Sequence, residues 1–169
     1  MSYLETPTRY ITVNNQKIAY RELGEGNSDI PLVMLVHLAA TMDDWDPKLL
    51  DLLAERQHVI VMDLPGVGSS EGSVATTIPG MAHQAAEIIQ ALGYQKVNLL
   101  GLSMGGMIAQ EVVRAYPALV NRLALVGTGP RGGAGIDAVT GTTFGYMARA
   151  SREKISPKRY IFYTHDAQG

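Results

Sequence analysis

The hydrophobic pattern divides the chain into short apolar runs that alternate with amphipathic stretches. Two strand-like runs, residues 10–13 and 17–21, flank the turn signal Asn14-Asn15-Gln16, which predicts an antiparallel hairpin. Four unbroken apolar runs follow, over residues 31–36, 58–62, 97–100 and 123–126. Continuous apolar runs are typical of parallel strands that are buried on both faces of a sheet.

Helical patterns fill the intervals between these runs. Asp46 and Pro47 predict an N-cap and a first helical residue. A second helix is expected over residues 79–92, with Gly93 just past its end, and a third is stopped by Pro117. The order of elements predicts an α/β fold: a mostly parallel sheet with helices on both faces.

The character of the chain changes after the last apolar run. Residues 127–135 are rich in glycine and predict a loop, and the periodicity beyond them is weaker. Residues 147–154 and 157–164 are the candidate helices there. We interpret residues 1–133 as the core domain and residues 134–169 as the start of a cap or flap region.

The segment around Ser103 carries the strongest chemical signal. It reads Gly101-Leu102-Ser103-Met104-Gly105, between an apolar strand and an amphipathic helix. A strand that turns abruptly into a helix strains the backbone of the serine, and Gly101 and Gly105 give it room. The arrangement exposes the Oγ of Ser103 and directs the backbone N–H of Met104 toward a developing oxyanion. It predicts Ser103 as a nucleophile, the alternative being a glycine-rich turn without chemistry.

A second oxyanion donor is expected at the carboxyl end of a neighbouring parallel strand. His37, Leu38 and Ala39 follow the strand of residues 31–36, so the backbone N–H of Leu38 or of Ala39 is the candidate partner for Met104. The alternative is an ordinary loop between a strand and a helix.

Three side chains near this loop are candidates for the wall of a substrate pocket. They are His37, Met42 and Trp45. Plain core packing is the commoner role of methionine and tryptophan, and a local hydrogen bond that shapes the loop is the alternative for His37.

Three segments together resemble the α/β-hydrolase fold family. They are residues 31–40, residues 63–70 and residues 101–106, which occur in the family's order and spacing. The resemblance covers about residues 10–133 and is strongest to the single-domain esterase, lipase and perhydrolase-like members. It implies a serine hydrolase of small ester or acyl substrates that works through an acyl-serine intermediate, with no cofactor and no metal.

The resemblance also implies roles for single residues. Ser103 would be the nucleophile, and Met104 and Ala39 the oxyanion donors, although this chain has Leu38 where the family usually has glycine. In the family an acid and then a histidine follow the serine on later strands. We expect this chain to hold the first six strands and to lack the last ones with that acid and histidine, so that it has little activity by itself.

Other chemistry-bearing residues have simpler interpretations. Asp63 ends a strand before a glycine-rich turn and is expected to stabilise that turn. The Gly66-Val67-Gly68 turn lacks the third glycine of a dinucleotide-binding loop. The histidines His58 and His83 are expected to be structural or solvated rather than general bases.

Composition limits the remaining possibilities. The 169 residues include 14 basic and 16 acidic side chains, a formal net charge of -2, and no cysteine. This balance indicates neither a nucleic-acid partner nor a membrane partner, and the absence of cysteine excludes disulfides and thiolate metal sites. We expect a cytoplasmic protein.

The last apolar run offers an alternative function. Leu123, Ala124, Leu125 and Val126 would form an apolar strand at the edge of the sheet if no later strand pairs with it. The alternative to an enzyme is therefore a non-catalytic ligand-binding module that self-associates through this edge.

Overall fold

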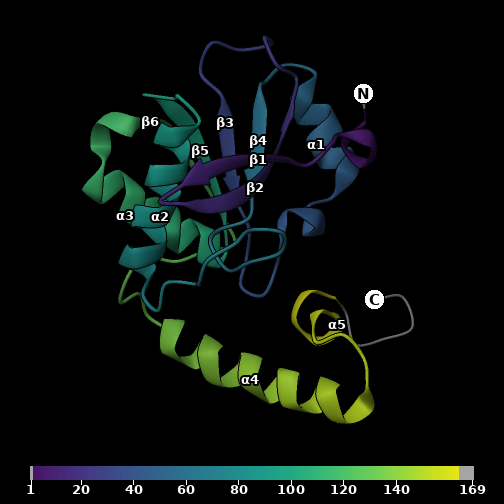
Figure 1. The fold of residues 1–169 in the computed structure, drawn as a ribbon. Coiled ribbons are helices and arrows are strands. Elements are labelled where there is room, and N and C mark those ends of the chain that lie inside the picture. The colour runs from purple at the N-terminus through teal and green to yellow at the C-terminus, as the bar shows by residue number, and fades with distance from the viewer. Residues whose placement is uncertain (1, 164–169) are drawn as a thin grey trace. The chain divides into compact units, whose positions relative to one another are not determined.

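A six-stranded mixed sheet runs through the first of two compact units, which extends to Pro130 (Figure 1). The structure is a computed structural model and describes residues 2–163. The strands lie in the order β1-β2-β4-β3-β5-β6. Their bounds are Arg9–Val13 (β1), Gln16–Leu23 (β2), Leu32–Leu35 (β3), Val59–Met62 (β4), Val97–Leu102 (β5) and Val120–Val126 (β6). Strands β4, β3, β5 and β6 are parallel, which confirms the predicted mostly parallel sheet.

The predicted hairpin joins β1 and β2. Val13 pairs with Gln16, so Asn14 and Asn15 alone form the turn. Their φ angles are 49° and 61°, in the left-handed region that two-residue hairpin turns require and that asparagine tolerates. The turn residues therefore determine where the first strand reverses.

Both faces of the sheet are covered, as strand β4 shows. Val59 and Val61 belong to a buried cluster with Leu50 of helix α1, whereas Ile60 and Met62 belong to a second cluster that includes residues of α2 and α3. Successive side chains of a strand point to opposite faces, so an unbroken apolar run fills two cores at once.

The helices begin and end close to the predicted positions. They are α1 (Pro47–Ala54), α2 (Ile78–Ala91) and α3 (Met104–Ala115), with single 3-10 turns at η1 (Tyr3–Glu5), η2 (Met42–Asp44) and η3 (Pro117–Leu119). The Asp46 carboxylate accepts a hydrogen bond of 2.8 Å from the backbone N–H of Lys48, which confirms it as the N-cap of α1. Gly93 follows α2 with a φ of 91°, as expected for a residue just past a helix.

The second unit begins at Arg131 and contains α4 (Ile136–Glu153) and α5 (Lys158–Phe162). Helix α4 starts well before residue 147, where the sequence pattern placed it, so that prediction is wrong. Gly141, Gly145 and several threonines weaken the apolar period along its first half, which hid the helix. Tyr146 and Tyr160 stack with ring centroids 5.8 Å apart and join the two helices. Across residues 2–163, no helix combines the length and the apolar character needed to cross a bilayer.

Candidate active site

Ser103 lies at the junction of β5 and α3 in an unusual backbone conformation. Its φ and ψ angles are 54° and −117°, and it is the N-cap of α3. Its backbone N–H donates a 2.9 Å hydrogen bond to the carbonyl oxygen of Val126 at the end of β6. The predicted strained elbow is therefore present, and the side chain is partly exposed.

Two glycines make this sharp turn possible because backbone comes too close for any side chain. A Cβ at Gly101 would lie 2.4 Å from the carbonyl oxygen of Gly105, and a Cβ at Gly105 would lie 2.2 Å from that of Leu35. The second contact brings the N-terminus of α3 directly against the end of β3. The flanking glycines thus bring the elbow next to the loop that follows β3.

Residues 37–41, which we call the β3 loop, lie at the point where the strand order reverses. The chain passes from β3 to its neighbour β4, and β5 later pairs with the other edge of β3. Ligand sites of open α/β sheets form outside the carboxyl ends of strands at such a point. Ala39 has a φ of 57°, and Nδ1 of His37 lies 2.8 Å from the carbonyl oxygen of Leu38. The latter contact is the local hydrogen bond expected of His37.

A pocket of about 390 Å³ brings the two predicted halves of the oxyanion site together. His37, Leu38, Ala39 and Met104 all line it. The rest of its wall is mostly apolar and consists of Leu35, Val36, Ala40, Thr41, Met62, Leu64, Gly66, Val67, Gly68, Val74, Met81 and Ile108. Such a cavity fits the apolar part of a small ligand.

Met42 and Trp45 lie elsewhere. Met42 is fully buried and Trp45 is 6% exposed, in the core cluster on the α1 side of the sheet, and neither lines this pocket. The pocket wall instead includes Val67, Val74 and Met81. Sequence reasoning missed them because nothing in the local pattern shows that the chain after β4 returns to the β3 loop.

Asp63 stabilises the turn that follows β4, as predicted. Its carboxylate is buried and accepts hydrogen bonds from the backbone N–H groups of Met42 (2.7 Å) and Ser69 (3.0 Å). A Cβ at Gly68 would lie 2.2 Å from Oδ2 of Asp63, so the turn closes tightly around the carboxylate. Burial raises the pKa of the Asp63 carboxyl, and the two N–H donors act in the opposite direction.

Two histidines have partners at a distance from Ser103. His58 precedes β4, at the end of the sheet opposite to the elbow, and its Nε2 lies 3.3 Å from Oε1 of Glu22. His83 contacts the hydroxyl of Tyr116 at the far end of α3, about 18 Å along that helix from Ser103. Their environments agree with structural roles. His165, which is the one histidine after Ser103 in the sequence, and its neighbour Asp166 lie outside the described residues.

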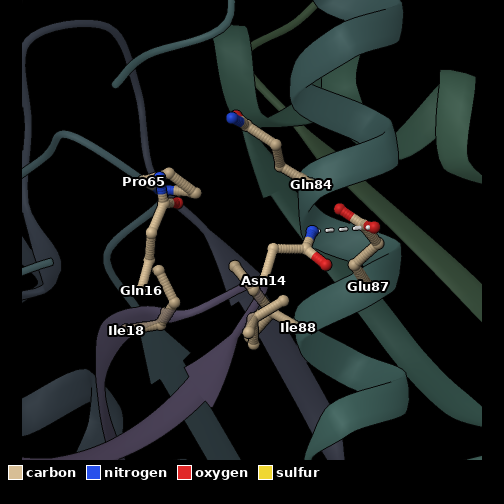
Figure 2. A pocket seen from close by; sticks show the side chains of 8 residues that line it. Asn14, Gln16, Ile18, Pro65, Gln84, Glu87 and Ile88 are labelled. Carbon is tan, nitrogen blue, oxygen red and sulfur yellow. Dashed lines mark hydrogen bonds between the residues drawn. The ribbon is translucent and has the colours of Figure 1, made fainter. Parts of the chain in front are cut away.

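A smaller pocket lies between the hairpin and α2 (Figure 2). Its volume is about 60 Å³, and Asn14, Gln16, Gln84 and Glu87 give it a polar wall. Asn14 donates a 3.1 Å hydrogen bond to Glu87 across it, drawn as the dashed line in Figure 2. The cavity has room for little more than water, so it does not compete with the pocket at the elbow.

Comparisons with known proteins agree with this arrangement. The family described as alpha/beta hydrolase fold matches residues 31–148. The chain is 34% identical over 114 residues to the (E)-2-((N-methylformamido)methylene)succinate hydrolase of Acinetobacter baylyi, covering 67% of this chain and 42% of that protein. It is 32% identical over 136 residues to the poly(3-hydroxyalkanoate) depolymerase of Ectopseudomonas oleovorans, covering 80% of this chain and 44% of that protein.

A solved structure extends the similarity to almost the whole chain. An α/β-hydrolase fold protein from Chitinophaga pinensis superposes with a TM-score of 0.87 at 34% sequence identity. The match covers 99% of this chain and 59% of that one. This chain thus spans less than half the length of the two curated relatives above and 59% of the solved structure. It belongs to the α/β-hydrolase fold family.

Proposed function

We propose that the protein is a serine hydrolase of small ester or similar acyl substrates, with Ser103 as the nucleophile. Its Oγ would attack the acyl carbon, the bond from that carbon to the leaving alcohol would break, and the serine proton would pass to the departing alcohol, which leaves an acyl-serine intermediate. Water would then attack the acyl carbon, release the carboxylic acid and restore the hydroxyl of Ser103. The backbone N–H groups of Met104 and of Ala39 or Leu38 would stabilise the negative charge on the carbonyl oxygen.

The observation that carries the proposal is the backbone of Ser103 in its setting. A residue at a φ of 54° between a strand and a helix is strained, and strain of this kind persists where the surrounding structure enforces it. Here the enforcing contacts come from β6 and from the two glycines, and Met104, the residue after the serine, lines the pocket of the β3 loop.

The nature of the pocket suggests the substrate class. Apart from His37, the larger side chains that line it are aliphatic or methionine, and the described part of the chain contributes no carboxylate, lysine or arginine to the wall. We therefore propose an uncharged, apolar acyl group, which gains free energy by leaving water.

Covalent labelling tests the proposal. The whole chain is incubated with an alkyl fluorophosphonate, and the adduct is located by peptide mass spectrometry. We expect modification of Ser103 in the wild type and none in Ser103→Ala. Ser73→Ala removes an exposed serine hydroxyl and should label like the wild type. Labelling that persists in Ser103→Ala would refute the nucleophile.

A second candidate function is self-association through β6, which one observation favours. β6 lies at the edge of the described sheet, and the side chains of Leu123, Leu125 and Val126 are 37%, 45% and 46% exposed. We propose that β6 of a second copy pairs there, since an apolar edge strand offers unpaired backbone groups. Sedimentation velocity should detect dimers that the edge substitution Leu125→Lys removes, and a concentration-independent monomer would exclude them.

A further inference from the structure

Both polar groups of the Met42 backbone are held by buried side chains from distant parts of the chain. Met42 directly follows the β3 loop and opens η2. Its N–H donates to Oδ1 of Asp63 over 2.7 Å, and its carbonyl oxygen accepts from the hydroxyl of Tyr3 over 2.5 Å. The end of the β3 loop is therefore fixed to β4 and to the N-terminal segment.

Tyr3 is itself firmly placed. It is 2% exposed, and its backbone N–H donates to Oδ1 of Asp51 in α1 over 2.6 Å. The guanidinium of Arg21 lies 5.1 Å from the centre of its ring and forms a 2.7 Å ion pair with Asp43, the residue after Met42. Burial raises the pKa of the Tyr3 hydroxyl, which keeps it protonated as a donor.

The core alone does not explain this polar arrangement. A buried phenylalanine would fill the same space without a hydroxyl that needs a partner. The Tyr3 hydroxyl, by contrast, reaches a carbonyl at the end of the loop that carries Ala39, whose φ of 57° is itself strained. Held at Met42, this loop has less freedom to relax away from the elbow.

We infer that Tyr3 and Asp63 are positioning residues for the β3 loop, which they hold through the N–H and C=O groups of Met42. The inference deepens the proposed function, on which it rests, because the loop carries one of the two proposed oxyanion donors. Oxyanion stabilisation depends on donors that are in place before charge develops, and small displacements of such groups are costly. Neither residue would touch the substrate.

Tyr3→Phe tests the inference because it removes the hydroxyl and keeps the ring. Two measurements are made on the whole chain: hydrogen exchange of peptides that cover residues 37–44, and the kinetics of Ser103 phosphonylation. We expect exchange in the loop to become about fivefold to tenfold faster, as for the loss of one buried hydrogen bond. The maximal labelling rate should fall by about tenfold, while the reagent concentration for half-maximal rate stays the same.

Tyr94→Phe is the matched control. It removes a tyrosine hydroxyl that donates to Glu22 over 3.1 Å, next to His58 at the start of β4, whereas the β3 loop lies at the other end of these parallel strands. It should leave both loop exchange and the maximal labelling rate at wild-type values. A purely structural role for Tyr3 would lower stability without changing the maximal rate of the folded chain.

The outcomes separate the two proposals. If the wild type is labelled at Ser103 and Tyr3→Phe exchanges or reacts like it, the positioning role is wrong and the proposed function stands. If the wild type is not labelled at Ser103, the proposed function fails. If hydrogen exchange in the loop of Tyr3→Phe is then also unchanged, the proposal that Tyr3 holds the loop through Met42 is wrong as well. Faster hydrogen exchange in Tyr3→Phe that is confined to residues 37–44 supports the role of Tyr3 in holding the loop, whether or not Ser103 is labelled.

Discussion

Gly105 packs against Leu35 so closely that a Cβ at position 105 would lie 2.2 Å from the carbonyl oxygen of Leu35. This contact joins the first turn of α3 to the last residue of β3. It is the point at which the elbow and the β3 loop meet, and the obstacle is backbone, which cannot move aside like a flexible side chain. The relation between these two residues therefore sets the geometry of the proposed site.

Gly105→Ala should disturb this contact. Because the added methyl group meets backbone atoms, we expect the free energy of unfolding to fall by about 1–3 kcal/mol, measured by urea unfolding. Labelling of Ser103 should also slow in the fraction that remains folded. Gly145→Ala is the control, since a Cβ there meets nothing within 4 Å and the residue lies in α4. Equal stability of Gly105→Ala and the wild type would contradict the close packing.

Ser103→Gly should be more stable than Ser103→Ala. Both variants lack the hydroxyl, but only glycine relieves the strain of a φ of 54°. We expect the free energies of unfolding to differ by about 1 kcal/mol, with neither variant labelled by a fluorophosphonate. If the alanine variant were as stable as the glycine variant, the backbone at Ser103 would not be strained.

Val74→Trp should alter selectivity for acyl length. Val74 lines the apolar pocket and is 47% exposed, so a larger side chain can fill the pocket entrance without disturbing the core. We expect phosphonates with a long alkyl chain to react about tenfold more slowly, and those with a short chain to react at the wild-type rate. Thr76→Trp, an exposed substitution two residues away that is outside the pocket wall, should leave both rates unchanged.

Asp63→Asn should change how stability depends on pH. Burial raises the pKa of the Asp63 carboxyl above its ordinary value of 3.8, so the folded chain keeps this proton to higher pH than the unfolded chain. This difference in proton binding stabilises the folded chain fully at a pH below the pKa that the carboxyl has in the unfolded chain. The stabilisation is lost as the pH rises through the pKa that the carboxyl has in the folded chain. The stability of the wild type relative to Asp63→Asn should therefore fall from acid toward neutral pH and then level off.

Urea unfolding of both proteins across that pH range measures this difference. Asparagine cannot accept hydrogen bonds at both terminal atoms, so the N–H of Met42 or of Ser69 also loses its partner at every pH. An increase in the relative stability of the wild type with rising pH would show that the pKa of Asp63 is lowered instead.

Much of the fold could be predicted because its signals are local. Asn14 and Asn15 tolerate the left-handed turn, Asp46 and Pro47 start a helix, and Gly93 ends one; each effect depends on neighbours within a few residues. The same is true of the elbow, where the spacing of Gly101, Ser103 and Gly105 specifies a sharp turn. The start of α4 was missed because its glycines and threonines weaken the local signal.

The pocket wall and the support of the β3 loop could not be predicted in the same way. Met42 and Trp45 are adjacent in sequence to the loop, yet they face the core on the α1 side, while Val74 and Met81 arrive from beyond β4. Tyr3 gave no signal, because its partner is 39 residues away. Such contacts depend on how the sheet brings distant segments together.

The sequence by itself thus determined the family, the strained serine and the order of strands and helices, since these follow from short-range backbone preferences and from the spacing of apolar residues. Only the tertiary structure decided which side chains line the pocket next to the elbow, and that Tyr3 and Asp63 hydrogen-bond to the backbone C=O and N–H of Met42. The physical reason is that burial and hydrogen bonding across the sheet join residues whose separation along the chain carries no local pattern.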